Sequence, residues 1–174
     1  MKKILFLTIL SIDAIIGFSQ NTPIFIHNKN GDELLNKSDT VGAITEYSKT
    51  IESNPDNYYA LKKRGLLYYA KGKYKEAEKD FTNCIAIKHT DAMVFYHRGN
   101  ARQKQAGDPS RISYKWDGVS SVATPDYSLS EIWKSSLNDY RTALELDPNL
   151  HDAYDQYSKM IRFQSKFQLN NMHN

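Results

Sequence analysis

The chain has 174 residues, of which 40% are hydrophobic and 25% are charged, and its formal net charge at pH 7 is +3. This length corresponds to one domain of ordinary globular composition. A nucleic-acid-binding surface needs a strong local excess of Lys and Arg, so a charge this small argues against nucleic acid as a partner. The single cysteine, Cys84, cannot form a disulfide within the chain, so we expect no disulfide framework.

The first residues have the features of a secretory signal peptide. Met1-Lys2-Lys3 is a basic start, and 4–18 is a mostly apolar run that leads to a predicted cleavage after Ser19. The run is shorter than the roughly 20 residues that span a bilayer, and it contains Asp13. We therefore expect 1–19 to be removed, which leaves a periplasmic or secreted protein without a membrane span. A retained anchor or an N-terminal helix is the alternative.

One stretch of the chain recurs at a fixed offset. Leu61 matches Phe95 and Gly65 matches Gly99, and the two pairs have the same separation along the chain. A period of about 34 residues is typical of stacked helix hairpins, in which no unit buries its apolar face without its neighbours. Apolar and small residues recur at helical spacing on both sides of Lys71-Gly72-Lys73, which predicts two helices joined by a tight turn.

These residues resemble the tetratricopeptide repeat (TPR) family, in particular its small exported bacterial members. The family pattern runs from a large residue through Gly, Tyr and Ala to an aromatic residue and a second small residue. Several linked units in one register make the resemblance specific. The residues at positions that the family uses for repeat packing are Gly31, Ala43, Tyr47, Leu61, Gly65, Tyr68, Ala77, Phe81, Cys84, Phe95, Gly99, Tyr140, Ala143 and, in a final helix, Tyr154.

The resemblance implies an all-α fold, a short right-handed superhelical array of about three helix hairpins with a C-terminal capping helix. The TPR domain would cover 20–168 and be followed by a polar tail at 169–174. A terminal capping element of this kind protects the end of a repeat array. The predicted units are 24–57, 58–91 and 92–150, and the predicted capping helix is 151–168.

The third unit contains a long insertion between its two helices. The spacing from the packing glycine to the packing aromatic residue is far larger there, from Gly99 to Tyr140, than in the second unit, from Gly65 to Phe81. The remaining motif positions of the two units keep a common register. The excess lies at 107–129, where clustered turn residues predict a loop.

This loop would carry the aromatic residues Tyr114, Trp116 and Tyr127. Loops of this length within compact domains are usually functional or disordered. Two interpretations stay open. The loop either covers part of the array or contacts a partner, or it is a solvated extension whose aromatic residues pack on their own hairpin.

The sequence contains no pattern that predicts catalysis or metal binding. His-Glu-x-x-His, paired Cys-x-x-Cys and glycine-rich phosphate loops are absent from it. Its five histidines are scattered along the chain. The acidic residues of 73–80, Asp80 included, alternate with lysines and predict a solvated helix face. We expect no enzyme activity, no cofactor and no metal site.

In the TPR family, the first helix of each unit lines a concave groove that binds a partner segment. Positions two, five, nine, twelve and thirteen of the unit face that groove. The groove implied here is aromatic and modestly basic, which favours an acidic or aromatic protein segment, unless the tyrosines pack against the next helix instead. The implied groove residues are Tyr59, Lys62, Leu66, Tyr69, Met93, Tyr96, His97, Asn100 and Lys104.

One specialised TPR groove can be tested on the sequence. Chaperone-binding members hold a C-terminal carboxylate with a Lys-Asn-Asn-Lys-Arg clamp drawn from three first helices. The five clamp positions are occupied here by Asn28, Asp32, Lys63, Met93 and His97. The sequence therefore predicts that the chaperone carboxylate clamp is absent.

These observations predict a non-catalytic protein-interaction module that binds a partner segment on its concave face. One alternative is a structural subunit of an envelope assembly, in which the convex face or the ends of the array make the contacts. A weaker alternative is an accessory factor that acts through the 107–129 loop. Repeat folds serve many tasks, so the sequence does not name the partner.

Overall fold

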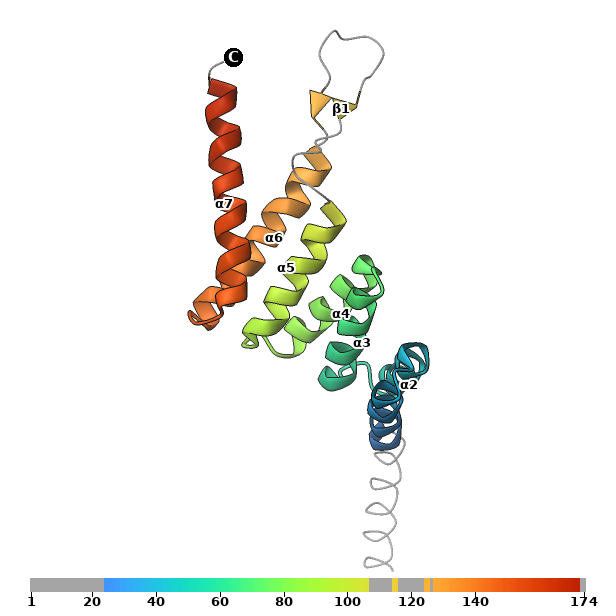
Figure 1. The fold of residues 1–174 in the computed structure, drawn as a ribbon. Helices are drawn as coiled ribbons and strands as arrows, with labels where there is room; N and C mark the ends of the chain where they lie inside the picture. Colours follow the sequence, from blue (N-terminus) through green and yellow to red (C-terminus); the bar gives the residue numbers. More distant parts are fainter. Residues whose placement is uncertain (1–23, 107–113, 116–123, 126, 173–174) are drawn as a thin grey trace, which may run out of the picture.

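A computed structural model describes residues 24–106, 114–115, 124–125 and 127–172, and these residues form an array of helix hairpins (Figure 1). The predicted signal peptide at 1–19 and Trp116 of the predicted loop lie outside the described residues. Consecutive helices lie side by side and stack from one end of the array to the other. The helices are 24–36, α2 (Thr40–Ser53), α3 (Tyr58–Ala70), α4 (Tyr74–Ile87), α5 (Ala92–Ala106), α6 (Tyr127–Leu146) and α7 (His151–Met172).

The predicted all-α hairpin array is confirmed, with corrections at two boundaries. Helix α6 begins at Tyr127, so Tyr127 belongs to a helix and not to the predicted loop at 107–129. Helix α7 continues to Met172, so most of the predicted polar tail at 169–174 is helical. Both differences arise because helix ends are set by backbone hydrogen bonding, which apolar periodicity locates only to within a few residues.

Two short strands lie inside the predicted insertion. Strand β1 (Tyr114–Lys115) pairs antiparallel with β2 (Thr124–Pro125), and Tyr114 lies opposite Pro125. The pairing brings the two sides of the insertion together before α6 begins. It leaves the hairpin of α5 and α6 in contact along its length.

Local side-chain chemistry sets several helix ends. Asp39 precedes α2 and accepts a hydrogen bond from the Gly42 amide at 2.9 Å. Asn57 precedes α3 and accepts one from the Ala60 amide at 2.9 Å. Such caps satisfy amides that have no partner within the helix. Between α3 and α4, Gly72 has φ +75°, a conformation that costs glycine little and other residues much more.

A glycine in each first helix lies directly against an aromatic ring of the second helix. A Cβ built on Gly31 would lie 2.7 Å from the nearest ring carbon of Tyr47. The same distance is 2.9 Å for Gly65 and the Phe81 ring, and 2.9 Å for Gly99 and the Tyr140 ring. These three rings are fully buried. The absence of a side chain on each glycine is therefore what lets the two helices of each hairpin approach.

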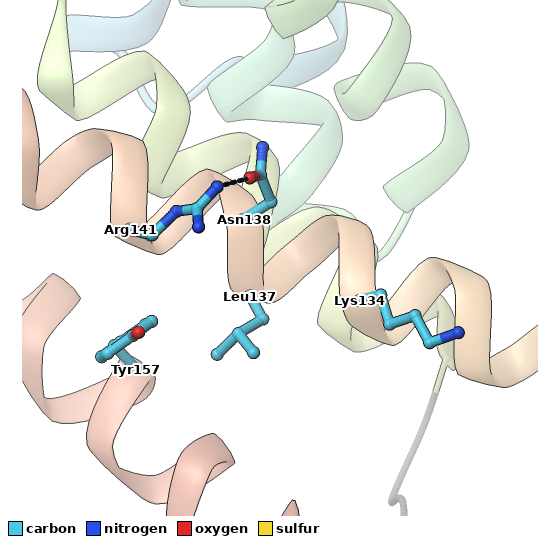
Figure 2. A pocket seen from close by; sticks show the side chains of 5 residues that line it. All are labelled: Lys134, Leu137, Asn138, Arg141 and Tyr157. Carbon is cyan, nitrogen blue, oxygen red and sulfur yellow. Dashed lines mark hydrogen bonds between the residues drawn. The ribbon is translucent and has the colours of Figure 1, made fainter.

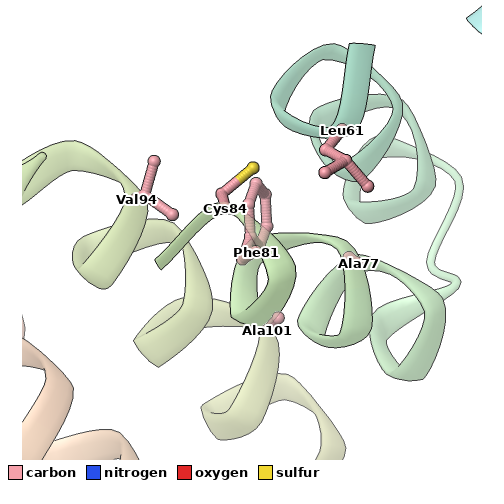
Figure 3. Packing of buried hydrophobic residues seen from close by; sticks show 6 residues of the cluster. All are labelled: Leu61, Ala77, Phe81, Cys84, Val94 and Ala101. Atoms are coloured by element: carbon pink, nitrogen blue, oxygen red, sulfur yellow. The ribbon is translucent and has the colours of Figure 1, made fainter. Parts of the chain in front are cut away.

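The central core is shared by neighbouring hairpins. Leu61 of α3, Phe81 and Cys84 of α4 and Val94 of α5 are fully buried in one cluster (Figure 3). Tyr68 is half-buried against the same cluster. Burial raises the pKa of the Cys84 thiol to about 12. The core therefore crosses the boundary between units, as expected of an array stabilised by its interfaces.

Tyr154 does not pack as the sequence predicted. It occupies the same repeat position as Leu61 and Phe95, whose side chains are 0% and 9% exposed. Tyr154 is 62% exposed, and α7 instead buries Ala153 and Met160. The second helix of the hairpin covers this position in the preceding units, and none of the described helices follows α7. Tyr154 therefore occupies the predicted position of the repeat but does not make the predicted packing contact.

We expect Gly65→Ala to destabilise the protein, because the new Cβ would lie 2.9 Å from the Phe81 ring. Overpacking of this kind costs about 1–3 kcal/mol, and the higher helix propensity of Ala offsets up to about 1 kcal/mol of it. Urea unfolding followed by circular dichroism measures the difference.

A second background separates the ring contact from other effects of the substitution. With Phe81→Leu the ring is gone, so Gly65→Ala should cost less in that background than in the native protein. An equal cost in both backgrounds would contradict the proposed role of the glycine.

Candidate functional site

Buried ion pairs, which the sequence patterns did not predict, join the first helices to the second helices of their hairpins. Arg64 donates from Nε and Nη2 to the two carboxylate oxygens of Asp80, both at 2.8 Å. Arg98 binds Asp139 in the same way, at 3.1 and 2.7 Å. The side chains of Asp80 and Asp139 are each only 1% exposed. The expectation that Asp80 lies on a solvated face is therefore wrong.

A repeated sequence signal could have revealed these pairs. Each arginine directly precedes the glycine of its hairpin, and each aspartate directly precedes the aromatic residue that the glycine contacts. A third N–H of each arginine reaches the previous unit, where Arg64 donates to Ser48 at 3.0 Å and Arg98 donates to Thr82 at 3.4 Å. Each guanidinium therefore joins three helices, which fixes the angle between adjacent units.

An additional arginine extends the ionic network in the third unit. Arg102 donates to Asp139 at 2.8 Å and to Glu78 at 2.7 Å. Gln105 donates to the other oxygen of Glu78 at 2.6 Å. Burial acts to raise the pKa of Glu78, but these hydrogen bonds outweigh it and hold the pKa below its usual value. The network therefore ties α4, α5 and α6 into one unit.

The first helices expose a row of large apolar side chains that recurs from unit to unit. Phe25, Tyr59 and Met93 occupy position two of successive units, at one constant offset along the chain. They are 70%, 42% and 38% exposed. Tyr59 and Met93 were predicted groove residues, whereas Phe25 was missed because the first unit matches the family pattern poorly. We call Phe25, Tyr59 and Met93 the apolar row.

One residue of this row, Tyr59, is fixed in place by an acidic neighbour. Its hydroxyl donates to both oxygens of Asp32, at 2.6 and 2.8 Å. The buried Tyr47 donates to the same carboxylate at 2.7 Å, and the Lys63 ammonium lies 3.5 Å away. Burial acts to raise the pKa of Asp32, and the hydrogen bonds from Tyr59 and Tyr47 lower it overall. Asp32 is therefore anionic at neutral pH and holds Tyr59 in one orientation.

The positive charge of Lys62, a predicted groove residue, is neutralised by an ion pair within the protein. Lys62 lies 2.7 Å from the Asp91 carboxylate, which also accepts a hydrogen bond from Tyr58. Leu66 packs against the central core, and Tyr69 makes an edge contact with Tyr74, with ring centroids 5.4 Å apart. These predicted groove residues therefore serve mainly to join helices.

Of the predicted groove residues on α5, some pack within the protein and others are exposed. The Tyr96 ring packs against Tyr140, with centroids 6.1 Å apart. Asn100 accepts a hydrogen bond from the Tyr140 hydroxyl at 2.7 Å. His97 stacks on Phe81 at 5.7 Å, and burial, together with the charge of Lys62, lowers the pKa of His97 to about 4. Only Met93 and Lys104 among the predicted residues of this helix are exposed.

A small open cleft lies between α6 and α7 at the C-terminal end of the array (Figure 2). Its two cations are already paired, since Lys134 lies 2.7 Å from Glu131 and Arg141 lies 3.7 Å from Glu145. The lining residues of the cleft are Lys134, Leu137, Asn138, Arg141 and Tyr157.

Two further findings concern only the described part of the chain. No group of three or more His, Cys, Asp and Glu side chains there is placed to hold a metal ion. None of the helices within the same ranges is long and apolar enough to cross a membrane.

Solved structures of known proteins share this architecture. The first TPR of Spaghetti (RPAP3), bound to the HSP90 peptide SRMEEVD, matches with a TM-score of 0.62 and 18% identity over 83% of this chain and 95% of that one. The Arabidopsis OM64 TPR domain matches with a TM-score of 0.60 and 18% identity, over 81% of this chain and 96% of that one. The chain has the TPR fold.

The sequence comparisons cover less of the chain. No family model matches it. Over 85 residues, or 49% of the chain, it is 31% identical to the DnaJ homolog subfamily C member 3 of Mus musculus. The human protein of the same name is 29% identical over the same length. The matched region spans only 17% of the length of each of these relatives.

His97 should make the stability of this protein sensitive to mild acid. The unfolded chain takes up a proton on this histidine near pH 6.5, whereas the folded protein resists protonation down to about pH 4. The stabilisation is therefore complete above pH 6.5 and is lost as the pH falls towards 4. Between pH 7 and pH 5 we expect a loss of about 2 kcal/mol, measured by urea unfolding.

Two substitutions test the assignment to His97. His97→Phe keeps an aromatic ring against Phe81 and should remove most of the pH dependence between pH 7 and pH 5. His89 is exposed, so His89→Gln should leave that dependence unchanged. If His97→Phe retains the native pH dependence, another group is responsible.

Removal of a buried carboxylate should lower the free energy of unfolding far more than removal of an exposed one. Asp139→Ala leaves Arg98 and Arg102 without their shared partner, and we expect a loss of about 3–5 kcal/mol in the free energy of unfolding. Glu131→Ala breaks the exposed pair with Lys134 and should cost less than about 1 kcal/mol. Chemical denaturation of both variants gives the comparison, and similar losses would refute the structural role of Asp139.

Proposed function

We propose that this protein is a non-catalytic interaction module that binds a partner segment along the concave face of its first helices. The observation that carries the proposal is the apolar row, in which Phe25, Tyr59 and Met93 recur with the period of the fold and stay exposed. Large apolar side chains at the surface are the residues that most often anchor a binding partner. A row that follows the repeat suits an extended segment, whose side chains would meet successive units.

The comparisons support the general mode of binding. The RPAP3 domains with the same fold were solved with HSP90 and HSP70 peptides. The fold therefore can present a peptide-binding face, although the identity of the ligand depends on the residues of that face. The predicted signal segment at 1–19 would place the encounter in the periplasm or outside the cell.

The ligand we propose is an internal apolar or aromatic segment rather than a C-terminal carboxylate. At the clamp positions, Asp32 presents a negative charge that would repel a carboxylate. His97 is neutral at physiological pH because its pKa is about 4. Lys62 is engaged by Asp91, which reduces the positive charge available to an acidic segment. Of the two predicted ligand classes, the aromatic one is therefore favoured.

Peptide selection on the native protein, followed by binding measurements, tests this proposal. Selected sequences should be rich in apolar and aromatic residues. Phe25→Ala combined with Met93→Ala should weaken their binding by about tenfold or more, because buried apolar anchors dominate such interfaces. The peptide SRMEEVD should not bind.

A matched pair of substitutions provides the control. Val41 on α2 and Ile87 on α4 are 62% and 39% exposed, which resembles Phe25 and Met93 in exposure but places them on second helices. Val41→Ala combined with Ile87→Ala should leave binding unchanged. Equal effects of the two double variants would refute binding at the apolar row, and tight binding of SRMEEVD would refute the proposed ligand class.

A further inference from the structure

Helix α7 carries an apolar face that none of the described helices covers. Tyr154 and Ile161 are 62% and 38% exposed. With the half-buried Ser158 they follow the spacing i, i+4, i+7, which places them on one side of the helix. Figure 1 shows α7 at the edge of the array. Terminal elements of repeat arrays normally present a polar outer face. An exposed apolar face at this position is therefore a candidate binding surface for another helix.

The repeat register shows that this face is suited to another helix. Ser158 occupies the position of Gly65 and Gly99, the glycines against which the second helix packs in the preceding hairpins. Serine is a small residue, so a second helix can pack against it, at a greater distance than against glycine. Tyr154 occupies the position of Leu61 and Phe95, which the second helix buries. The face of α7 therefore has the form of an incomplete hairpin.

A charge pattern beside this face identifies the partner helix. Asp152, Asp155, Lys159 and Arg162 follow the spacing i, i+3, i+7, i+10 and form an exposed stripe. The stripe is acidic in its N-terminal half and basic in its C-terminal half. Lys159 lies 3.1 Å from Asp155 in the same helix, and both side chains remain more than half exposed. A stripe with this polarity is complementary to an antiparallel copy of itself.

We propose that this face joins two copies of the chain through an antiparallel pairing of their α7 helices. Tyr154 of one copy would then lie against Ile161 of the other, with Ser158 near the twofold axis. The same axis brings Asp155 towards Lys159 and Asp152 towards Arg162 across the interface, because all three pairs are centred at residue 157 or between 157 and 158. A twofold interface must be self-complementary, and both the apolar face and the charged stripe meet that condition.

The two kinds of contact have different roles. Burial of Tyr154 and Ile161 supplies the affinity, since aromatic and aliphatic anchors dominate interfaces. The exposed charge pairs contribute little affinity but select the antiparallel orientation, as the flanking charges do in coiled coils. The face of α7 does not include the apolar row, so dimer formation and peptide binding are separable.

Sedimentation equilibrium of the native chain over a range of concentrations is the first test. It should show a reversible monomer–dimer equilibrium. Ile161→Glu should raise the dissociation constant of the dimer by about tenfold or more. Ile87→Glu changes a residue of equal exposure, 39% against 38%, on α4 and should leave the dimer intact. Circular dichroism confirms that both variants fold. A native chain that stays monomeric, or a dimer that tolerates Ile161→Glu, would overturn the proposal.

Charge exchange tests the orientation independently of the apolar contact. Asp152→Lys with Asp155→Lys makes the whole stripe basic, and Lys159→Asp with Arg162→Asp makes it acidic. Each variant alone should dimerise more weakly than the native chain because like charges face one another. A mixture of the two should form the heterodimer. Absence of that preference would refute the antiparallel pairing.

A crosslink can locate the axis. Ser158→Cys should form a disulfide between two copies under mild oxidation, because the residue lies beside the twofold axis. The native Cys84 is fully buried and should not compete. Ser53→Cys, on the exposed end of α2, is the control and should not crosslink. Equal crosslinking of the two variants would argue against the proposed interface.

Discussion

Every hairpin of this protein depends on the close approach of a first helix to an aromatic ring, and that approach is possible only at a residue without a side chain. The contact between the glycine and the ring also brings the polar residues next to them in the sequence close together. Because an arginine precedes Gly65 and an aspartate precedes Phe81, closure of the hairpin brings Arg64 within 2.8 Å of Asp80. A carboxylate this deeply buried needs such bidentate partners to offset its desolvation. Apolar packing and ionic bonding therefore depend on one another.

The long insertion leaves this arrangement intact. Gly99 lies as close to its aromatic ring as Gly65 does, although the third unit has many more residues between its helices. The entropy of closing a loop grows only slowly with its length, and the contact between α5 and α6 is extensive. The repeat can therefore accept extra chain at this point without changing the register of the exposed residues.

The first-helix face combines two different tasks. Most of its polar groups are satisfied within the protein, as Asp32 is by two tyrosine hydroxyls and Lys62 is by Asp91. These bonds hold the helices at fixed spacing and leave few free charges for a ligand. In the binding mode that we propose, the apolar row recognises the partner, and its spacing follows from the stacking of the units. The end of the array presents a second apolar face, on α7, with its own charge pattern.

The repeat and its register can be read from the sequence alone. Matching residues recur at a constant offset, as from Gly65 to Gly99. This pattern can be recognised without any knowledge of the fold. Together with the resemblance to the TPR family, it predicted the hairpins, the packing glycines and aromatics, and the position of the extra chain in the third unit. The recurrence of Arg-Gly and of Asp before an aromatic residue was also readable, but its meaning appears only when two helices are brought together.

Which side chains are buried depends on how the helices pack together, and this is known only from the structure. Asp80 and Tyr154 were both assigned from the pattern of their own helix. Asp80 is buried because an arginine of the opposing helix reaches it, and Tyr154 is exposed because no described helix lies against it. The predicted groove residues divide for the same reason into those that join helices and those that face outward. Burial depends on neighbours that are distant in the sequence, so periodicity can place a residue on a face but cannot say what that face meets.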